Sequence, residues 1–270
     1  MSQTQKMNRL LITGAAGRIG SDMRNRLTDL AHTLRLSDIS DLGDAKESEE
    51  IVYCDLGDPP AVLELVKGCD GIVHLGGKAN EGPWDVIRNA NIDGVLNLYE
   101  AARQHGVKRI VFASSYHTIG YYKQTETLDA STPARPDSLY GVSKVFGEAL
   151  ASMYHDKFGI ETALVRIGST FPEPHSYRMM QTWFSPADFS RLIDWAFSVP
   201  ELGCPIIFGV SDNTTVWWDN ASIAALGWRA VDSSEPYRAQ VEAKFEAPEK
   251  GSVDDVFQGG VFTNFKFFEA

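Results

Sequence analysis

RLLITGAAGRIG, residues 9–20, joins a short apolar run to a glycine-rich turn. The run predicts a buried parallel strand, and the amphipathic pattern that follows predicts a helix through Leu30. Glycines in such a turn let a pyrophosphate approach the backbone, and the helix N-terminus offers free N–H groups and the positive end of its dipole. The stretch therefore predicts a dinucleotide-binding βα unit, with a plain βα turn as the alternative.

An acidic residue follows the glycines by about 20 positions, where a ribose is usually bound. Residues 32–37 predict a second strand, and Asp38 stands at its end. A carboxylate there accepts hydrogen bonds from both ribose hydroxyls and repels a 2′-phosphate, which favours NAD over NADP. Arg18 is an opposing signal, because an arginine in this loop can bind a 2′-phosphate. Asp38 carries more weight because it should face the diol directly, so NAD is the predicted cofactor.

Strands and helices alternate through most of the chain. Further strands are predicted at residues 51–56, 71–77, 108–115 and 162–167, and further helices at residues 60–67, 84–105 and 137–157. This alternation predicts an α/β fold with a Rossmann-type doubly wound parallel sheet. After residue 168 the pattern breaks into short segments rich in aromatic residues. We therefore expect residues 1–167 to form an NAD-binding core and residues 168–270 a small substrate-binding cap, integrated as one structural unit.

A tyrosine and a lysine lie four residues apart in the predicted helix 137–157. Tyr140 and Lys144 therefore share one helix face. The ammonium should favour the phenolate and lower the pKa of Tyr140, which makes the phenol a candidate proton acceptor. A Y-x-x-x-K spacing alone is weak, because it occurs by chance in many helices. Ser115 strengthens it: this serine ends a predicted strand, and ligands gather beyond the carboxyl ends of parallel strands. A strand-end cap is the alternative for Ser115.

Composition and spacing exclude several classes of function. The net charge of −11, from 36 acids and 25 bases, argues against nucleic-acid and anionic-membrane partners. Three cysteines without C-x-x-C predict free thiols in a reducing compartment, and the histidine spacings predict no metal site. The opening MSQTQKMN lacks an apolar signal core, and no apolar run reaches about 18 residues. We expect a cytoplasmic protein with no membrane span.

The chain resembles the extended short-chain dehydrogenase/reductases. The resemblance rests on the glycine turn, Asp38, Ser115 and the Tyr140/Lys144 pair, which occur in this order and on these elements. A narrower resemblance, to the uronate dehydrogenases, covers nearly the whole chain. It rests on residues 14–20, 74–77, 112–115, 117–122, 139–144, 166–169, 177–179, 217–220 and 258–260. That family oxidises the anomeric carbon of hexuronates with NAD and gives an aldarolactone.

The resemblance implies a role for each matching residue. Tyr140 would be the base, Lys144 its partner, and Ser115 a hydrogen-bonding group for the reacting hydroxyl. Arg178 would hold the C6 carboxylate, with a surface salt bridge as the alternative. The other implied sugar contacts are Ser169 and His117, the latter with a structural histidine as its alternative. The implied cofactor contacts, besides Asp38, Tyr140 and Lys144, are Gly14, Gly17, Arg18, Ile19, Gly20, Asp55, Leu56, Leu75, Gly76, Gly77, Asn91 and Ile167.

Two sites in the pocket depart from the family pattern. Tyr116 replaces an asparagine, and Lys78-Ala79 replace a β-branched residue and a serine. These substrate-pocket changes remove an amide and a hydroxyl and add a cation, although a solvated Lys78 is favoured over one that touches the ligand. A bulkier acid with three oxygens would suit them, as in sulfoquinovose, a glucose with a sulfonate on C6. The sequence thus narrowly favours oxidation of sulfoquinovose to its 1,5-lactone, with glucuronate or galacturonate dehydrogenase as the alternative.

Two remoter classes of function compete with these. An NDP-sugar epimerase or dehydratase would share the first half of the chain, but it usually carries a larger C-terminal domain than residues 168–270 provide. A non-enzymatic NAD-sensing regulator can lose the Tyr/Lys pair, whereas this chain retains both residues. The expected partners are a small anionic sugar and further copies of the chain in a homo-oligomer.

Overall fold

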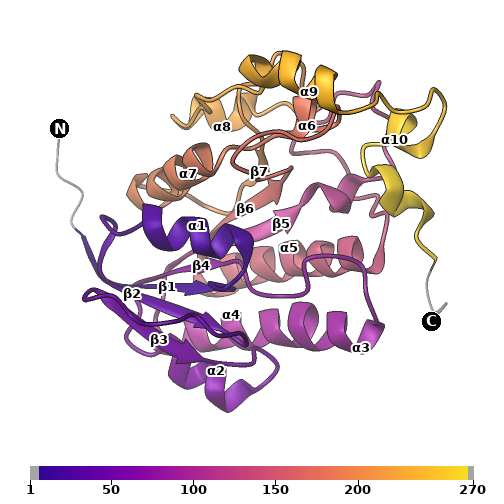
Figure 1. Ribbon diagram of the computed structural model, residues 1–270. Coiled ribbons are helices and arrows are strands. Elements are labelled where there is room, and N and C mark those ends of the chain that lie inside the picture. Colours follow the sequence, from indigo (N-terminus) through magenta and orange to yellow (C-terminus); the bar gives the residue numbers. More distant parts are fainter. Residues whose placement is uncertain (1–5, 267–270) are drawn as a thin grey trace.

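A seven-stranded sheet organises the computed structural model, which describes residues 6–266 (Figure 1). All of its pairings are parallel, in the order β3-β2-β1-β4-β5-β6-β7. The strands are β1 (Met7–Thr13), β2 (Ala31–Asp38), β3 (Glu49–Tyr53), β4 (Gly71–His74), β5 (Arg109–Ser115), β6 (Glu161–Ile167) and β7 (Ile206–Gly209). The chain reverses direction across the sheet between β1 and β4, which is where doubly wound sheets bind ligands.

Helices cover both faces of this sheet. One face carries α1 (Arg18–Arg26) and α7 (Pro186–Ser198), and the other carries α2 (Pro59–Val66), α4 (Gly94–His105) and α5 (Leu139–Phe158). The remaining helices are α3 (Trp84–Ile87), α6 (Met179–Thr182), α8 (Ala221–Ala225), α9 (Arg238–Lys244) and α10 (Val253–Val256), with a π-turn at η1 (Arg88–Asp93) and 3₁₀ turns at η2 (Tyr116–Ile119), η3 (Glu235–Tyr237) and η4 (Gly260–Asn264). No helix within residues 6–266 is both long and apolar enough to cross a membrane.

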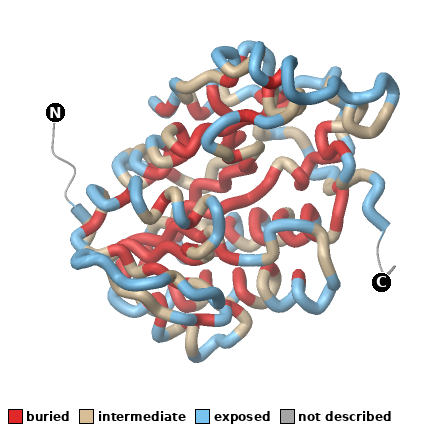
Figure 2. The backbone as a smooth tube through the Cα atoms, in the orientation of Figure 1, coloured by how far each residue is buried: buried red, intermediate tan, exposed pale blue. Residues whose placement is uncertain are grey.

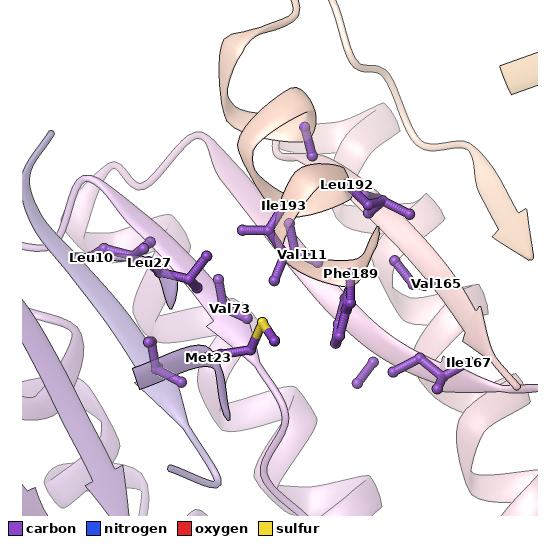
Figure 3. Close-up of a cluster of buried hydrophobic side chains, with 14 of the residues drawn as sticks. Leu10, Met23, Leu27, Val73, Val111, Val165, Ile167, Phe189, Leu192 and Ile193 are labelled. Carbon is purple, nitrogen blue, oxygen red and sulfur yellow. The ribbon is translucent and has the colours of Figure 1, made fainter. Parts of the chain in front are cut away.

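Two apolar cores lie on the two faces of the sheet. Successive strand residues point to opposite faces, so Leu10 and Ile12 enter one core while Leu11 enters the other. Figure 3 shows the first core, where Met23 of α1 and Phe189 of α7 lie over the same face of the sheet. The buried residues form a continuous layer along the sheet (Figure 2). The doubly wound fold predicted from the sequence is confirmed.

The structure corrects several predicted elements. A seventh strand, β7, and its neighbour α7 complete the sheet and one helical layer, although both lie in the region predicted as a cap. The short run that forms β7 is too brief to stand out as a strand in the sequence. The helix α1 ends at Arg26 rather than Leu30, because a turn follows in which the Leu30 N–H donates to the Leu27 carbonyl. The strands β3 and β4 end three residues before their predicted limits.

A buried ion pair fastens α5 to the middle of the sheet. Arg166 on β6 donates from Nε and Nη2 to the two carboxylate oxygens of Glu148 on α5, at 2.9 and 2.8 Å. Ser114 on β5 donates to the same carboxylate at 2.6 Å. The Arg166 side chain is only 2% exposed and that of Glu148 8% exposed, so solvent water cannot replace either partner of the ion pair.

We predict that Arg166→Met strongly destabilises the protein. The substitution leaves the Glu148 carboxylate buried with one hydroxyl partner, and breaking a buried pair in this way costs about 3–5 kcal/mol. Urea unfolding followed by circular dichroism measures the loss. The double variant Arg166→Met/Glu148→Leu should recover more than half of it, because no buried charge remains. A single variant that loses less than about 1 kcal/mol would contradict this role.

Candidate active site

A cavity of about 640 Å³ opens at the carboxyl ends of β1, β2 and β4. It lies at the point where the strand order reverses, as expected for a nucleotide site. Eight of the predicted cofactor residues line it: Gly14, Gly17, Asp38, Asp55, Leu56, Leu75, Gly76 and Gly77. The structure therefore brings together residues from four separate loops that the sequence assigned to one ligand.

The glycine turn is shaped by close backbone approaches. Gly14 has a φ of 69°, and a Cβ there would lie 2.6 Å from the backbone N of Gly76. A Cβ at Gly20 would lie 2.2 Å from the Gly14 carbonyl oxygen. Beside the turn, Asp38 accepts hydrogen bonds from the N–H groups of Ala16 and Ser40, both at 3.0 Å. A tight turn at a helix N-terminus with an oriented acid at the cavity wall fits the diphosphate and ribose of NAD.

Three predicted cofactor residues have other principal contacts. Asn91 lies in the π-turn, and its side-chain amide bonds the backbone N–H and carbonyl of Lys78 and the hydroxyl of Ser143. Ile19 and Ile167 pack against the apolar core. Asn91 thus links the loop after β4 to α5, and the cofactor roles of these three residues stay predictions.

Tyr140 and Lys144 are buried on one face of α5, at 7% and 6% exposure. Ser138 caps the helix by accepting from the Gly141 N–H at 3.0 Å, and Glu81 accepts from the Tyr140 N–H at 3.0 Å. Ser115 lies close enough to the Tyr140 phenol to lower its pKa. The predicted set of Ser115, Tyr140 and Lys144 is therefore assembled at the edge of the sheet.

The expected lowering of the tyrosine pKa is wrong for the protein without its cofactor. Burial raises the pKa of Tyr140 to about 12, against a smaller lowering by the Ser115 hydrogen bond. Burial also lowers the pKa of Lys144 to about 8. The ammonium attracts the phenolate, but both groups also lose their surrounding water, and this loss disfavours each charged form.

A buried histidine packs beside the tyrosine. The Nδ1 of His117 lies 2.8 Å from a carboxylate oxygen of Asp137, and its ring stacks on Phe262 with centroids 3.8 Å apart. The rings of His117 and Tyr140 meet edge to face at 5.8 Å. Burial lowers the pKa of His117. With Nδ1–H donated to Asp137, the neutral ring keeps Nε2 as a hydrogen-bond acceptor.

Arg178 is held by aromatic rings next to this cluster. Its guanidinium carbon lies 4.9 Å from the ring centre of Trp217 and 5.4 Å from that of Tyr116. Nη1 donates to the Phe257 carbonyl at 3.2 Å, while the buried Nη2 has no hydrogen-bond partner among the residues described. This is not the surface salt bridge weighed as an alternative for Arg178. A half-buried cation with a spare, buried N–H suits an anionic ligand.

The residues that depart from the family pattern separate in space. Tyr116 contacts Arg178 and packs against His117 and Trp218. Lys78 and Ala79 instead line the dinucleotide cavity. Ser169 lies beyond the end of β6, with its hydroxyl 3.0 Å from that of Thr182.

Sequence reasoning missed Glu81, Asp137 and Phe262. Asp137 is 2% exposed and so closely packed that a Cβ at Gly120 or Gly259 would lie 1.7 or 2.0 Å from it. Only Asp137 had a usable signal, because it precedes the serine that caps the helix. Glu81 and Phe262 reach the site through tertiary packing alone.

Comparisons with known proteins agree with this geometry. The model of the NAD dependent epimerase/dehydratase family matches residues 10–191. A uronate dehydrogenase of Agrobacterium fabrum is 55% identical over 97% of this chain and 99% of its own. A mutant uronate dehydrogenase from Agrobacterium tumefaciens, solved in complex with NAD, is 54% identical with a TM-score of 0.96, over 97% of this chain and 99% of that chain.

A glucuronic acid dehydrogenase from Chromohalobacter salexigens is similar as well. Its crystal structure has a TM-score of 0.95 and 55% identity, over 96% of this chain and 98% of that chain. The chain belongs to the NAD dependent epimerase/dehydratase family and is an NAD-dependent oxidoreductase of the uronate dehydrogenase type.

Proposed function

We propose that the protein oxidises the C1 hydroxyl of a hexuronate, glucuronate or galacturonate, to the 1,5-lactone. The observation that carries this is Arg178, a half-buried cation whose Nη2 has no hydrogen-bond partner among the described residues. Tyr116 lies between Arg178 and His117 and contacts both. The uronate dehydrogenases to which the chain is similar support a carboxylate as the anion.

A hexuronate is thus favoured over sulfoquinovose, the substrate that the sequence narrowly favoured. Lys78 and Ala79 were two of the three positions that favoured a sulfonate, and both line the cofactor cavity. Of these three positions, Tyr116 is the one that contacts Arg178. Its phenol could donate to a third acid oxygen, so sulfoquinovose is the second candidate.

In the proposed reaction the phenol of Tyr140 first releases its proton to solvent, and the phenolate oxygen then accepts the proton of the C1 hydroxyl as the C1=O bond forms. Ser115, close to the Tyr140 phenol, orients that hydroxyl. NAD, when bound, supplies the hydride acceptor for the C1 hydrogen. Lys144 is protonated at neutral pH because its pKa is about 8, and its charge favours the phenolate form of Tyr140 that accepts this proton.

Arg178 would bind the substrate at the far end from C1. Its planar guanidinium can donate two parallel hydrogen bonds to a carboxylate. Such a contact fixes the sugar ring relative to Tyr140 without touching the reacting bond. The lactone forms directly from the cyclic sugar, so this step requires no water.

We predict that NADH forms rapidly with glucuronate and galacturonate and slowly with neutral glucose. Arg178→Ala should lower kcat/KM for the uronates by about 10- to 100-fold, the value of lost hydrogen bonds to a charged group. The exposed Arg26→Ala is the matched control. Absorbance of NADH measures all rates. A higher kcat/KM with sulfoquinovose than with either uronate would show that the preferred substrate carries a sulfonate and not a carboxylate.

We predict that Tyr140→Phe loses turnover by about 10²- to 10⁴-fold, the usual contribution of a general base. Its dissociation constant for NAD should stay within about twofold of the wild type, because the ring remains in place. Isothermal titration with NAD and an NADH assay separate the two effects. The control is Tyr53→Phe at a surface position that is 73% exposed. Surviving activity in Tyr140→Phe would place the base elsewhere.

We predict that Lys144→Met is inactive but more stable than the wild type at pH 7. The folded-state pKa of about 8 lies below the ordinary 10.5, so the buried ammonium costs stability below pH 8, by about 3 kcal/mol. Between pH 8 and 10.5 the unfolded chain binds more protons, and this cost disappears as the pH rises. Urea unfolding at pH 7 and pH 10 should therefore show a gain that shrinks at pH 10. The exposed Lys157→Met is the control, and an equal gain at both pH values would contradict the burial argument.

A further inference from the structure

The glycine turn contacts a loop that is remote in sequence. Arg18 is the first residue of α1, and its guanidinium carbon lies 3.5 Å from the centre of the Phe171 ring. Burial lowers the pKa of Arg18, and the carboxylate that offsets this is Asp22 of the same helix. The guanidinium, which in this position could bind a 2′-phosphate, is thus held against an aromatic face.

Phe171 belongs to residues 170–182, here called the 170–182 loop, which is closed at its base. The Ser169 N–H donates to the Thr182 carbonyl at 2.8 Å, and the Phe184 N–H donates to the Ser169 carbonyl at 3.0 Å. Just after the loop, the Trp183 indole donates to the Phe171 carbonyl at 2.8 Å, and within the loop His175 packs edge-on to the Phe171 ring at 4.2 Å. These contacts give Phe171 a defined position.

The same loop carries Arg178. One end therefore reaches the turn where α1 begins, and the other reaches the aromatic cluster of Tyr116 and Trp217. A helix N-terminus is the ordinary site for a diphosphate. A guanidinium stacked through its face keeps its N–H edge free for such an anion, so Phe171 can orient Arg18 toward it.

We propose that Arg18 and Phe171 form a clasp that strengthens NAD binding and couples it to binding of the acidic sugar. The coupling rests on the proposed function, in which Arg178 binds the substrate carboxylate. A loop fastened at Phe171 presents Arg178 in a fixed position, and a sugar bound to Arg178 in turn holds Phe171 against Arg18. Such coupling is reciprocal: each ligand tightens the other by the same factor.

The test is a titration of NAD in the inactive Tyr140→Phe background, with and without saturating glucuronate. We expect glucuronate to lower the Kd for NAD in the parent. Adding Phe171→Leu should raise the Kd for NAD alone by about 5- to 30-fold, the value of a partly desolvated cation–π contact. The same substitution should bring the effect of glucuronate close to onefold, and Phe171→Tyr should restore both values.

The chain offers a matched control in a second cation–π pair. Arg103 lies over the Phe158 ring at 5.3 Å on the outer face of α4 and α5. Phe158→Leu should leave the Kd for NAD and the effect of glucuronate unchanged. Arg18→Met removes the other half of the clasp and should reproduce the losses of Phe171→Leu. It also serves if Phe171→Leu fails to fold, as checked by its melting temperature.

Three results would overturn the inference in different ways. An unchanged Kd for NAD in both Phe171→Leu and Arg18→Met would remove the clasp. A raised Kd with the full effect of glucuronate would leave a cofactor contact but remove the coupling. A parent in which glucuronate does not alter the Kd for NAD would also remove the coupling. In that last case the NADH assay on wild-type enzyme separates the two failures, because turnover of glucuronate would show that the proposed function still holds.

Discussion

The carboxylate of Glu148 is the point on which the geometry of the site depends. Tyr140, Lys144 and Glu148 follow one another at four-residue intervals on α5, so they share a helix face. Glu148 is bonded by Arg166 and Ser114, on two neighbouring strands. The pair thus sets both the distance of α5 from the sheet and its rotation about its own axis. That rotation decides whether the phenol meets Ser115 at the end of β5.

Burial strengthens the contacts that Tyr140 and Lys144 can make with a substrate, but it lowers the stability of the folded protein. Water around Tyr140 would stabilise its phenolate without help, but it would also weaken every directed contact with a substrate. Here the phenol is kept neutral and the ammonium of Lys144 is held at a cost. The two groups are poised so that a positively charged ligand or a proton donor at the site alters their balance. The two apolar cores and the buried ion pair of Arg166 and Glu148 offset this loss of stability.

Local signals in the sequence were enough for the fold and the centre of the site. The turn of Gly14 to Gly20, the acid Asp38 and the Tyr140/Lys144 spacing each follow from the backbone geometry of one βα unit or one helix. The missed features arise from packing between remote segments. The strand β7 is short, and Phe262 reaches His117 from the opposite end of the chain. The position of Lys78 depends on its backbone pairing with Asn91, which no spacing reveals.

The π-turn at Arg88–Asp93 has a consequence for how the family can vary. A π-turn holds one residue more than an α-turn, and such bulges tend to arise by insertion at sites of function. Here the extra residue allows Asn91 to face Lys78 and Ser143 together. Deleting one residue from this turn would rotate the preceding or following helix by about 100° and carry the amide off the junction. The number of residues in this turn is therefore constrained more tightly than the identity of most of them.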